Sequence, residues 1–278
     1  MPTPGLSLLG FMDAQQAIAH LQSVCVCANP DPAILSAEWN QARARLGGAI
    51  PRAGQPNLLP LPDRHAPYIA QLQSQPWCAA TLAMWPGHEF KLVEIDPLLA
   101  FQLTVDDRRS NHHCGSLVGT PILEELLPIC LPLQQALEPF MAFQTQTSVL
   151  LKSNSLNLQA FGGGVYNASF MGLQFGLSLP FIHVVRCNGR CYLHNGFHRA
   201  LGIRRAGATH MPCVFRDVPD HAAVGIRTDG STFSASLLES ANPPTVGHFT
   251  RGRAWPVELK RLARYLHVSW SEYVLPED

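Results

Sequence analysis

Two short stretches of the sequence gather side chains that could carry out chemistry. The first is Asn195-Gly196-Phe197-His198-Arg199, which stands between a predicted strand and a predicted helix. The first N–H groups of a helix lack intrahelical acceptors and carry partial positive charge, so we expect an anion to bind there. Gly196 lets the backbone approach a ligand closely, and Arg199 can hold two phosphate or carboxylate oxygens at once. The open alternative is that Gly196 only forms a turn and Arg199 is only a surface cation.

The second stretch places acidic, basic and soft-ligand side chains within nine residues: Asp106, Asp107, Arg108, Arg109, His112, His113 and Cys114. A metal site would use His112, His113 or Cys114, but adjacent ligands point in divergent directions and no second ligand pair at zinc-like spacing follows. We therefore predict a surface loop from which Arg108 or Arg109 reaches the phosphate site.

The elements around the first stretch follow from local patterns. Residues 181–186 are a β-branched and aromatic run, Asn188-Gly189 favours a two-residue turn, and residues 191–193 resume an extended pattern, which together predict a hairpin. Residues 200–206 have helical spacing, and Gly207 stands where a left-handed C-cap is expected. A further strand is predicted at residues 211–215.

The segment from Phe181 to Val218 resembles the ParB/sulfiredoxin superfamily, whose members have a strand, a turn, a second strand, a Gly-x-x-Arg box that opens a helix, and a closing strand. The matching pieces of this sequence are Ile182-His183-Val184-Val185-Arg186, Asn188-Gly189-Arg190, Cys191-Tyr192-Leu193, Gly196-Phe197-His198-Arg199, Ala206-Gly207 and Met211-Pro212-Cys213-Val214. Upstream, residues 91–109 are similar to the superfamily's entry strand and Arg-bearing loop.

The resemblance implies a function for these residues. In that superfamily the Gly-x-x-Arg box binds nucleotide phosphates, so Asn195, Gly196, Phe197, His198 and Arg199 are the expected nucleotide-binding residues. ATP, ADP or CTP is the expected ligand, and an Arg199→Ala variant is expected to lose nucleotide binding while it keeps its fold.

The sequence departs from the superfamily pattern at three places. Phe197 replaces the nucleophilic Cys of sulfiredoxins, so repair of sulfinic acids is not expected. Phe197 and His198 replace the Glu and first Arg of the chromosome-partitioning members. Asn195 stands where the free-serine kinases have an Asp. A neutral amide is a weaker metal ligand than a carboxylate, so this position gives less reason to expect a metal ion.

We expect catalytic roles for four side chains. His198 or His194 would act as acid, base or charge stabiliser, and Arg108 or Arg109 would neutralise developing charge. A Mg²⁺ ion is expected, with Asp106 and Asp107 as its nearest candidate ligands.

Composition limits the classes of function. The 278 residues are 46% hydrophobic and 14% charged with a formal net charge of +0, so no global charge favours nucleic acid. No run of eighteen apolar residues is present, which argues against a membrane span. The first residues lack a basic region and include Asp13, which argues against a secretory signal. The eight cysteines contain no C-x-x-C pair and are read as reduced thiols of a cytoplasmic, bacterial-type protein.

The remaining patterns predict the organisation of the chain. Helices are predicted after Asp13 to about Val24, over Pro32 to Leu46, over residues 66–73 and 120–148, and over residues 255–267, with a shorter one at 234–240. Strands are predicted at residues 78–85, 90–95 and 101–105. The Gly-rich stretch 149–180 is either a mobile lid or a packed irregular segment; its Gly162-Gly163-Gly164 lacks the ending of a nucleotide P-loop.

The predicted fold is therefore α/β (α+β): a ParB/sulfiredoxin-like mixed sheet with flanking helices. Residues 1–75 would be an N-terminal helical extension, 76–218 the nucleotide-binding core with an insertion at about 115–180, and 219–278 a C-terminal helical segment. The leading hypothesis is phosphoryl transfer or nucleotide hydrolysis at the Gly-x-x-Arg site. The alternative is a non-catalytic module in which a bound nucleotide regulates a protein partner. DNA binding is disfavoured by the net charge.

Overall fold

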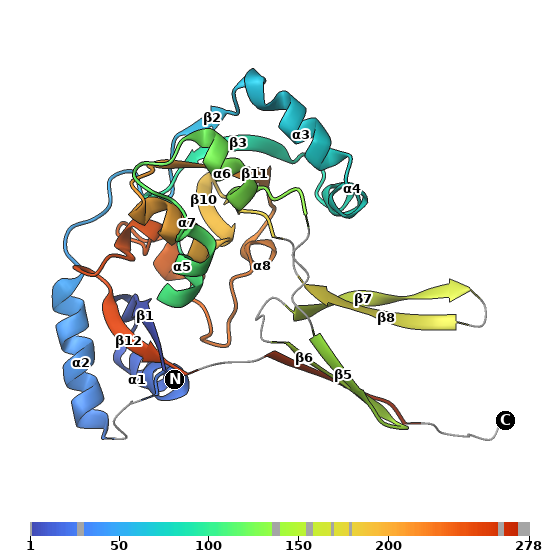
Figure 1. Ribbon diagram of the computed structural model, residues 1–278. Helices are drawn as coiled ribbons and strands as arrows, with labels where there is room; N and C mark the ends of the chain where they lie inside the picture. The colour runs from blue at the N-terminus through green and yellow to red at the C-terminus, as the bar shows by residue number, and fades with distance from the viewer. Residues whose placement is uncertain are drawn as a thin grey trace. The chain divides into compact units, whose positions relative to one another are not determined.

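A mixed sheet of five strands, in the order β10-β9-β11-β3-β2, is the largest sheet of the protein (Figure 1). The computed structural model describes residues 2–26, 31–134, 140–153, 158–167, 170–177, 180–260 and 264–271. The strands of this sheet are β2 (Leu58–Pro60), β3 (Glu89–Glu94), β9 (His183–Cys187), β10 (Arg190–Asn195) and β11 (His210–Asp217). β9 and β11 are parallel, whereas the other neighbours are antiparallel. Parallel neighbours need a crossover, which β10 and helix α7 (Phe197–Arg205) supply.

A second sheet brings together three strands that are far apart in the sequence. Its order is β12-β1-β4, with β1 (Thr3–Ser7) paired antiparallel to both β12 (Trp255–Leu259) and β4 (Thr104–Asp106). The N-terminal strand therefore joins segments from the middle and the end of the chain. Residues 1–75 are not a separate helical extension in this arrangement.

Helices surround these two sheets. They are α1 (Ala14–Val24), α2 (Pro32–Arg45), α3 (Ala66–Gln73), α4 (Pro76–Ala83), α5 (Asp107–Cys114), α6 (Leu123–Cys130), α8 (His221–Val224) and α9 (Ala235–Leu238), with short 3₁₀ turns at Leu9–Phe11, Asp63–His65 and Val246–His248. Asp13 caps α1 by accepting a hydrogen bond from Gln16 N at 2.8 Å, and Asp31 caps α2 in the same way through Ala33 N at 2.9 Å. Among the described residues, no helix has the length and apolar character needed to cross a membrane.

Much of the hydrophobic core lies where helix α7 packs against the five-stranded sheet and against α5. Four of the five residues of β9 are buried, and the apolar side chains of α7 are buried against the sheet and against α5. A cluster of large side chains, among them Tyr192, Phe181 and Leu99, is excluded from solvent. Burial of this apolar surface is the main favourable term in folding.

Contacts divide the chain into two units. The first unit contains residues 1–134 and 180–260, and the second contains residues 135–179 and 261–278. In the second unit, β5 (Phe140–Gln144), β6 (Ser148–Ser153) and β13 (Arg264–Ser269) form a sheet in the order β13-β6-β5. β7 (Leu158–Asn167) and β8 (Phe170–Leu177) form a separate antiparallel pair.

Several local predictions are confirmed. Helices α1, α2 and α3, the 183–195 hairpin, α7 and strand β11 lie where the sequence indicates. Asn188 and Gly189 have φ angles of 50° and 73°, as a two-residue hairpin turn requires. Gly207 has φ 98° just after α7. The mixed α and β composition of the fold is also confirmed.

Other predictions are wrong. Residues 78–85 lie largely in helix α4 rather than in a strand, because Pro76 starts a helix and the following Ala and Leu residues propagate it. Residues 107–114 form α5 instead of a loop, because Asp106 caps them by accepting from Arg108 N and Arg109 N. Residues 255–259 and 264–267 lie in strands β12 and β13 instead of one helix.

The predictions for residues 120–180 are partly outside the described residues. Among the described residues of the predicted helix at 120–148, Leu123–Cys130 is helical, and strand β5 begins at Phe140. The Gly-rich stretch contains β7 and β8, so its described part is regular strand and not irregular structure. Residues 154–157, 168–169 and 178–179 of that stretch are outside the described residues.

Candidate functional site

The junction between β10 and α7 is built on a bulge and a glycine. Leu193 pairs with Val184 and Asn195 pairs with His183, so His194 is the extra residue of a bulge in β10. Bulges redirect a side chain and are common next to functional sites. Gly196 caps α7 with φ 100°, and a Cβ there would lie 2.6 Å from Ile182 Cδ1. Only glycine is tolerated at this position without strain.

His194 is held in one tautomer at this junction. Its Nδ1 lies 2.9 Å from the carbonyl oxygen of Val224. A carbonyl can only accept, so Nδ1–H is the donor and Nε2 keeps its lone pair. Burial lowers the pKa of His194, against a smaller opposing effect of this hydrogen bond. The imidazole is therefore neutral near pH 7 and presents Nε2 as a base or acceptor.

His183 lies directly beside His194 and has an incomplete set of hydrogen bonds. It is 1% exposed, and its ring centroid lies 4.8 Å from that of His194 in an edge-to-face arrangement. Arg216 Nε lies 3.3 Å from His183 Nε2. Arginine can only donate, so Nε2 accepts and Nδ1 carries the proton. That Nδ1 is buried and has no partner among the described residues.

Arg216 and Trp85 complete the group. The indole of Trp85 stacks on His183 with centroids 4.2 Å apart and planes inclined by 16°. The guanidinium of Arg216 lies 5.5 Å from the Trp85 ring centroid. Arg216 is half-buried, and among the described residues no carboxylate pairs with it. The positive charge of this group therefore lacks a counter-charge within the described part of the chain.

We call His183, His194, Arg216 and Trp85 the His-Arg cluster. Sheet register explains why two of its members meet: His183 on β9 is the partner of Val214 on β11, and Arg216 is two residues further along the same face. Sequence reasoning named His194 but missed the other three side chains. The signal that was present is a histidine and an arginine placed inside otherwise apolar strands.

Arg199 is bonded to main-chain oxygens. Its Nη1 donates to Ile129 O at 3.0 Å and also to Pro180 O. The side chain is buried, and burial lowers its pKa. Ile129 and Pro180 lie on the two chain segments that lead to and from residues 135–179, and Ile182 N also bonds to Cys130 O at 2.8 Å. In this conformation Arg199 ties these segments together.

The other residues of the Gly-x-x-Arg box have different surroundings. Asn195 Nδ2 donates to Phe181 O at 3.1 Å. Phe197 is buried and packs edge-to-face on Phe101 with centroids 5.6 Å apart. The ring of Phe197 is thus part of the core. His198 is half-buried in the first turn of α7.

The second polar stretch lies at the other end of α7. Helices α5 and α7 are side by side (Figure 1), and a Cβ on Gly202 would meet Cys114 Sγ at 2.6 Å. Asp107 pairs with Arg205, in the last turn of α7, at 2.7 Å. Arg108 and Arg109 start α5 beside that last turn, about 13 Å along the helix axis from Gly196. The structure therefore does not bring them to the β10–α7 junction.

Asp106 and Asp107 do not fit a Mg²⁺ ion. Asp106 Oδ1 accepts from Arg108 N at 2.8 Å and from Arg109 N at 3.2 Å, while Asp107 is paired with Arg205. In the part of the chain that the structure describes, no three His, Cys, Asp or Glu side chains are grouped as metal ligands. A Mg²⁺ ion held by six oxygen ligands has no partner set here.

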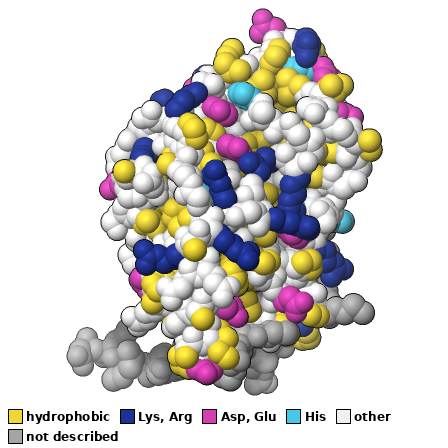
Figure 2. Space-filling view, turned by 90° about the vertical axis from the view of Figure 1, so that its left-hand side faces the viewer, with side chains coloured by type: hydrophobic (Ala, Val, Ile, Leu, Met, Phe, Trp, Pro, Cys, Tyr) yellow, Lys and Arg dark blue, Asp and Glu magenta, His cyan; other side chains and the backbone are white. Residues whose placement is uncertain are grey.

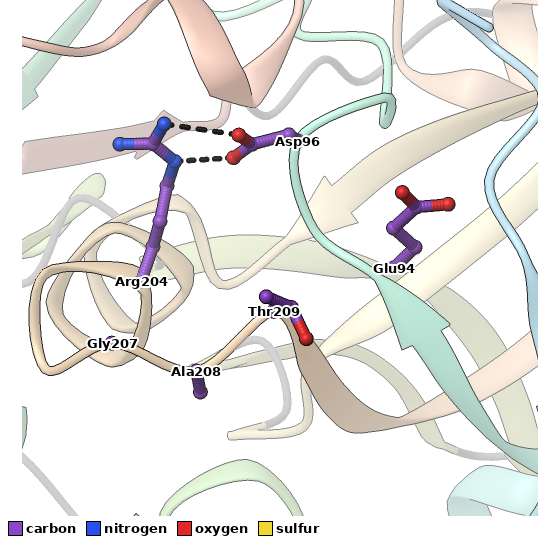
Figure 3. A pocket seen from close by; sticks show the side chains of 6 residues that line it. All are labelled: Glu94, Asp96, Arg204, Gly207, Ala208 and Thr209. Carbon is purple, nitrogen blue, oxygen red and sulfur yellow. Dashed lines mark hydrogen bonds and ion pairs between the residues drawn. The ribbon is translucent and has the colours of Figure 1, made fainter. Parts of the chain in front are cut away.

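Two hollows lie elsewhere in the first unit. One, of about 290 Å³, is lined by Glu94, Asp96, Arg204, Gly207, Ala208 and Thr209 (Figure 3). Asp96 forms two hydrogen bonds with Arg204, as the dashed lines of Figure 3 show, and Glu94 pairs with Arg52 at 3.5 Å. The other, of about 390 Å³, is lined by Asp107 and Arg251 among others. The charges of the first hollow are already matched.

The face shown in Figure 2 carries both basic and acidic side chains. Figure 2 shows Lys and Arg side chains interspersed with Asp and Glu on the side that it displays. Some basic side chains are paired with carboxylates, for example Arg204 with Asp96 and Arg205 with Asp107. Non-specific DNA affinity is built from many unneutralised cations, so no observation here favours DNA binding.

Comparison with known proteins adds no relative: no protein family, no curated protein and no solved structure matches the chain.

Proposed function

We propose that the chain binds a nucleotide by its phosphate groups at the β10–α7 junction and transfers or hydrolyses a phosphoryl group there. The observation that carries this proposal is the fixed orientation of His194. Its Nδ1 donates to Val224 O at 2.9 Å, which leaves the Nε2 lone pair as a base two residues before Gly196 and the start of α7. A base and an anion-binding helix start are thereby adjacent.

The proposed reaction uses two parts of the protein, the start of helix α7 and the side chain of His194. The first N–H groups of α7 hold phosphate oxygens, and α7 has no side-chain cap that would compete for them. His194 Nε2 accepts the proton of water, or of an acceptor hydroxyl, as its oxygen forms a bond to phosphorus. The bond between phosphorus and the leaving oxygen of the nucleotide breaks, and that oxygen departs with its electron pair.

We also propose that the five-stranded sheet belongs to a divergent ParB/sulfiredoxin-like core. Support comes from the order β9, Asn188-Gly189 turn, β10, Gly196, α7 and β11, which follows the superfamily's order of elements. Gly196 at φ 100° stands at the position of the first residue of its Gly-x-x-Arg box. If the chain shares this order of elements with the superfamily, its nucleotide site is expected at the same place, the start of α7.

One observation favours the alternative of a non-catalytic, nucleotide-responsive module. Arg199 Nη1 already bonds to Ile129 O and Pro180 O, on both sides of residues 135–179. A phosphate that drew Arg199 away would release both carbonyls and alter the connection to the second unit. In this alternative the nucleotide would regulate a protein partner without being consumed.

Calorimetric titration with ATP, ADP, CTP and GTP, with and without Mg²⁺, tests the proposal when each mixture is then separated by chromatography. Binding with product formation supports the enzyme. Binding without product supports the regulatory module, and no binding to any of the four refutes both.

A His194→Gln variant separates the two roles. Gln offers no base, so we expect turnover to fall about 10²- to 10⁴-fold while nucleotide affinity changes little. His267→Gln, on exposed strand β13, is the matched control and should behave as the wild type. Wild-type turnover in His194→Gln would contradict the role of His194.

A further inference from the structure

The strongest unexplained feature of the molecule is a buried hydrogen-bond donor beside an unpaired cation. His183 is 1% exposed, and its Nδ1 has no partner among the described residues. Buried polar groups without a partner are uncommon in folded proteins, and each one calls for a missing acceptor such as water or a ligand oxygen. Arg216, which bonds to the same ring at 3.3 Å, also lacks a carboxylate partner in the described chain.

These donors are positioned by rigid elements. His183 and Arg216 lie on neighbouring parallel strands of the central sheet, and Trp85 covers one face of the His183 ring at 4.2 Å. His194 is fixed by Val224 O. The Arg216 guanidinium and the His194 ring therefore both lie next to the His183 ring, at the end of β10 that leads into α7. A site built on strands holds its groups more accurately than one built on loops.

The hydrogen-bond donors of Arg216 and His183 favour an oxyanion as the ligand. Arg216 supplies several donors in a planar fork and His183 supplies one more, and no carboxylate among the residues that the structure describes pairs with either side chain. A carboxylate or phosphate offers the required acceptors, and the lone pair of His194 Nε2 is left for the proton of the water or hydroxyl that attacks the phosphorus. Desolvation makes such charge-assisted hydrogen bonds stronger than they are at the surface.

We propose that Arg216, His183 and His194 form an oxyanion subsite that receives the terminal phosphate of the nucleotide. That the ligand is a nucleotide rests on the proposed function. That the subsite binds an anion does not, because it follows from the donors of Arg216 and His183. Since His183 is buried and Trp85 stacks over it, only the end of a ligand reaches the subsite, so the sugar and base of the nucleotide remain outside it. Arg216 thereby takes the phosphate-binding role that the sequence assigns to Arg199.

The first experiment uses inorganic phosphate as the probe. In the full chain with ¹⁵N-labelled histidine, phosphate is expected to shift the imidazole resonances of His183 and His194. An Arg216→Gln variant should lose phosphate affinity by roughly tenfold or more, since it loses charge-assisted hydrogen bonds. Unshifted His183 and His194 resonances at saturating phosphate would mean that His183 Nδ1 is satisfied by an internal water only, and would overturn the proposal.

The matched control is Arg64→Gln. Arg64 Nε also bonds to a buried histidine, His65 Nε2, at 3.1 Å, but the Arg64 side chain itself is exposed and pairs with Glu124. The Arg64→Gln substitution removes a positive charge and an Arg–His contact, as Arg216→Gln does, but phosphate affinity should not change. If Arg216→Gln does not fold, Arg216→Lys keeps the charge but loses the fork, and its phosphate affinity should still fall severalfold. Wild-type affinity in a folded Arg216 variant would refute the subsite.

Nucleotide titrations separate this proposal from the proposed function. If nucleotides are turned over equally by the wild type and Arg216→Gln, the subsite is refuted while the function stands. If phosphate binding depends on Arg216 but no nucleotide binds, the subsite stands and the nucleotide function is refuted.

Discussion

At the scale of single residues, the donors and acceptors around each imidazole define its protonation. Val224 O requires Nδ1–H on His194, and Arg216 requires a lone pair at Nε2 of His183. The two rings therefore present opposite groups, a lone pair on one and an N–H on the other. An acid-base pair of this kind depends on hydrogen-bond partners and not on residue type alone, which is why a list of histidines would not reveal it.

Because Arg199 bonds to two main-chain carbonyls, its mutation is expected to lower stability. An Arg199→Met variant leaves the carbonyls of Ile129 and Pro180 without their donor, and relief of the buried charge offsets part of that loss. We expect the free energy of unfolding to fall by about 2 kcal/mol, measured by urea denaturation.

An Arg64→Met variant serves as the comparison, because Arg64 is exposed and its ion pair with Glu124 should contribute little. Unchanged stability of Arg199→Met, together with lost nucleotide binding, would return Arg199 to the role of a phosphate ligand.

At the scale of elements, the close approach of α5 and α7 positions the start of α7. Gly202 makes this approach possible, because its missing Cβ leaves room for Cys114 and for Ser110 O. The pair also carries the Asp107–Arg205 ion pair. A shift of α7 would move Gly196 and the junction with it.

A Gly202→Ala variant tests this packing. Its Cβ would lie 2.6 Å from Cys114 Sγ and 2.9 Å from Ser110 O, so the helices must move apart. We expect a loss of about 1–3 kcal/mol in the free energy of unfolding, measured in urea, despite the better helix propensity of alanine. Gly252→Ala, where nothing lies within 4 Å, should be close to neutral. Equal stability of the two variants would argue against tight α5–α7 packing.

At the scale of the whole molecule, several buried histidines link stability to pH. Burial lowers the pKa of His20 and of His248 from 6.5 to about 4, and lowers the pKa of His183 and His194 as well. Between pH 6.5 and about 4 the unfolded chain binds protons that the folded chain does not. The stability gained from neutral histidines is therefore complete above pH 6.5 and is lost as the pH falls through this window.

We accordingly expect the free energy of unfolding to decrease from pH 7 to pH 5, as measured by urea denaturation at both values. A His248→Asn variant, whose amide oxygen can still accept from Thr245 N, should show a weaker pH dependence than the wild type. A stability maximum at pH 5 would contradict the assignment of these histidines as neutral and buried.

The two-unit organisation is also a property of the whole molecule. The segment between residues 134 and 180 leaves the first unit and returns to it at positions joined by the Cys130 O–Ile182 N bond of 2.8 Å. The sequence indicates an insertion at about this place but does not show that the last residues of the chain join it through β13 and β6. Such a pairing involves residues more than a hundred positions apart.

The sequence by itself determined the features that depend on neighbouring residues. Asp13 and Asp31 cap their helices, Asn188-Gly189 turns the hairpin, and Gly196 and Gly207 bound α7, because each acts through backbone conformation or hydrogen bonds within a few positions. Only the tertiary structure decided that residues 255–259 pair with β1 as a strand, and that His183, His194 and Arg216 meet. Both results depend on the order of strands in a sheet, and strand pairing is set by the burial of distant segments against each other and not by local preference.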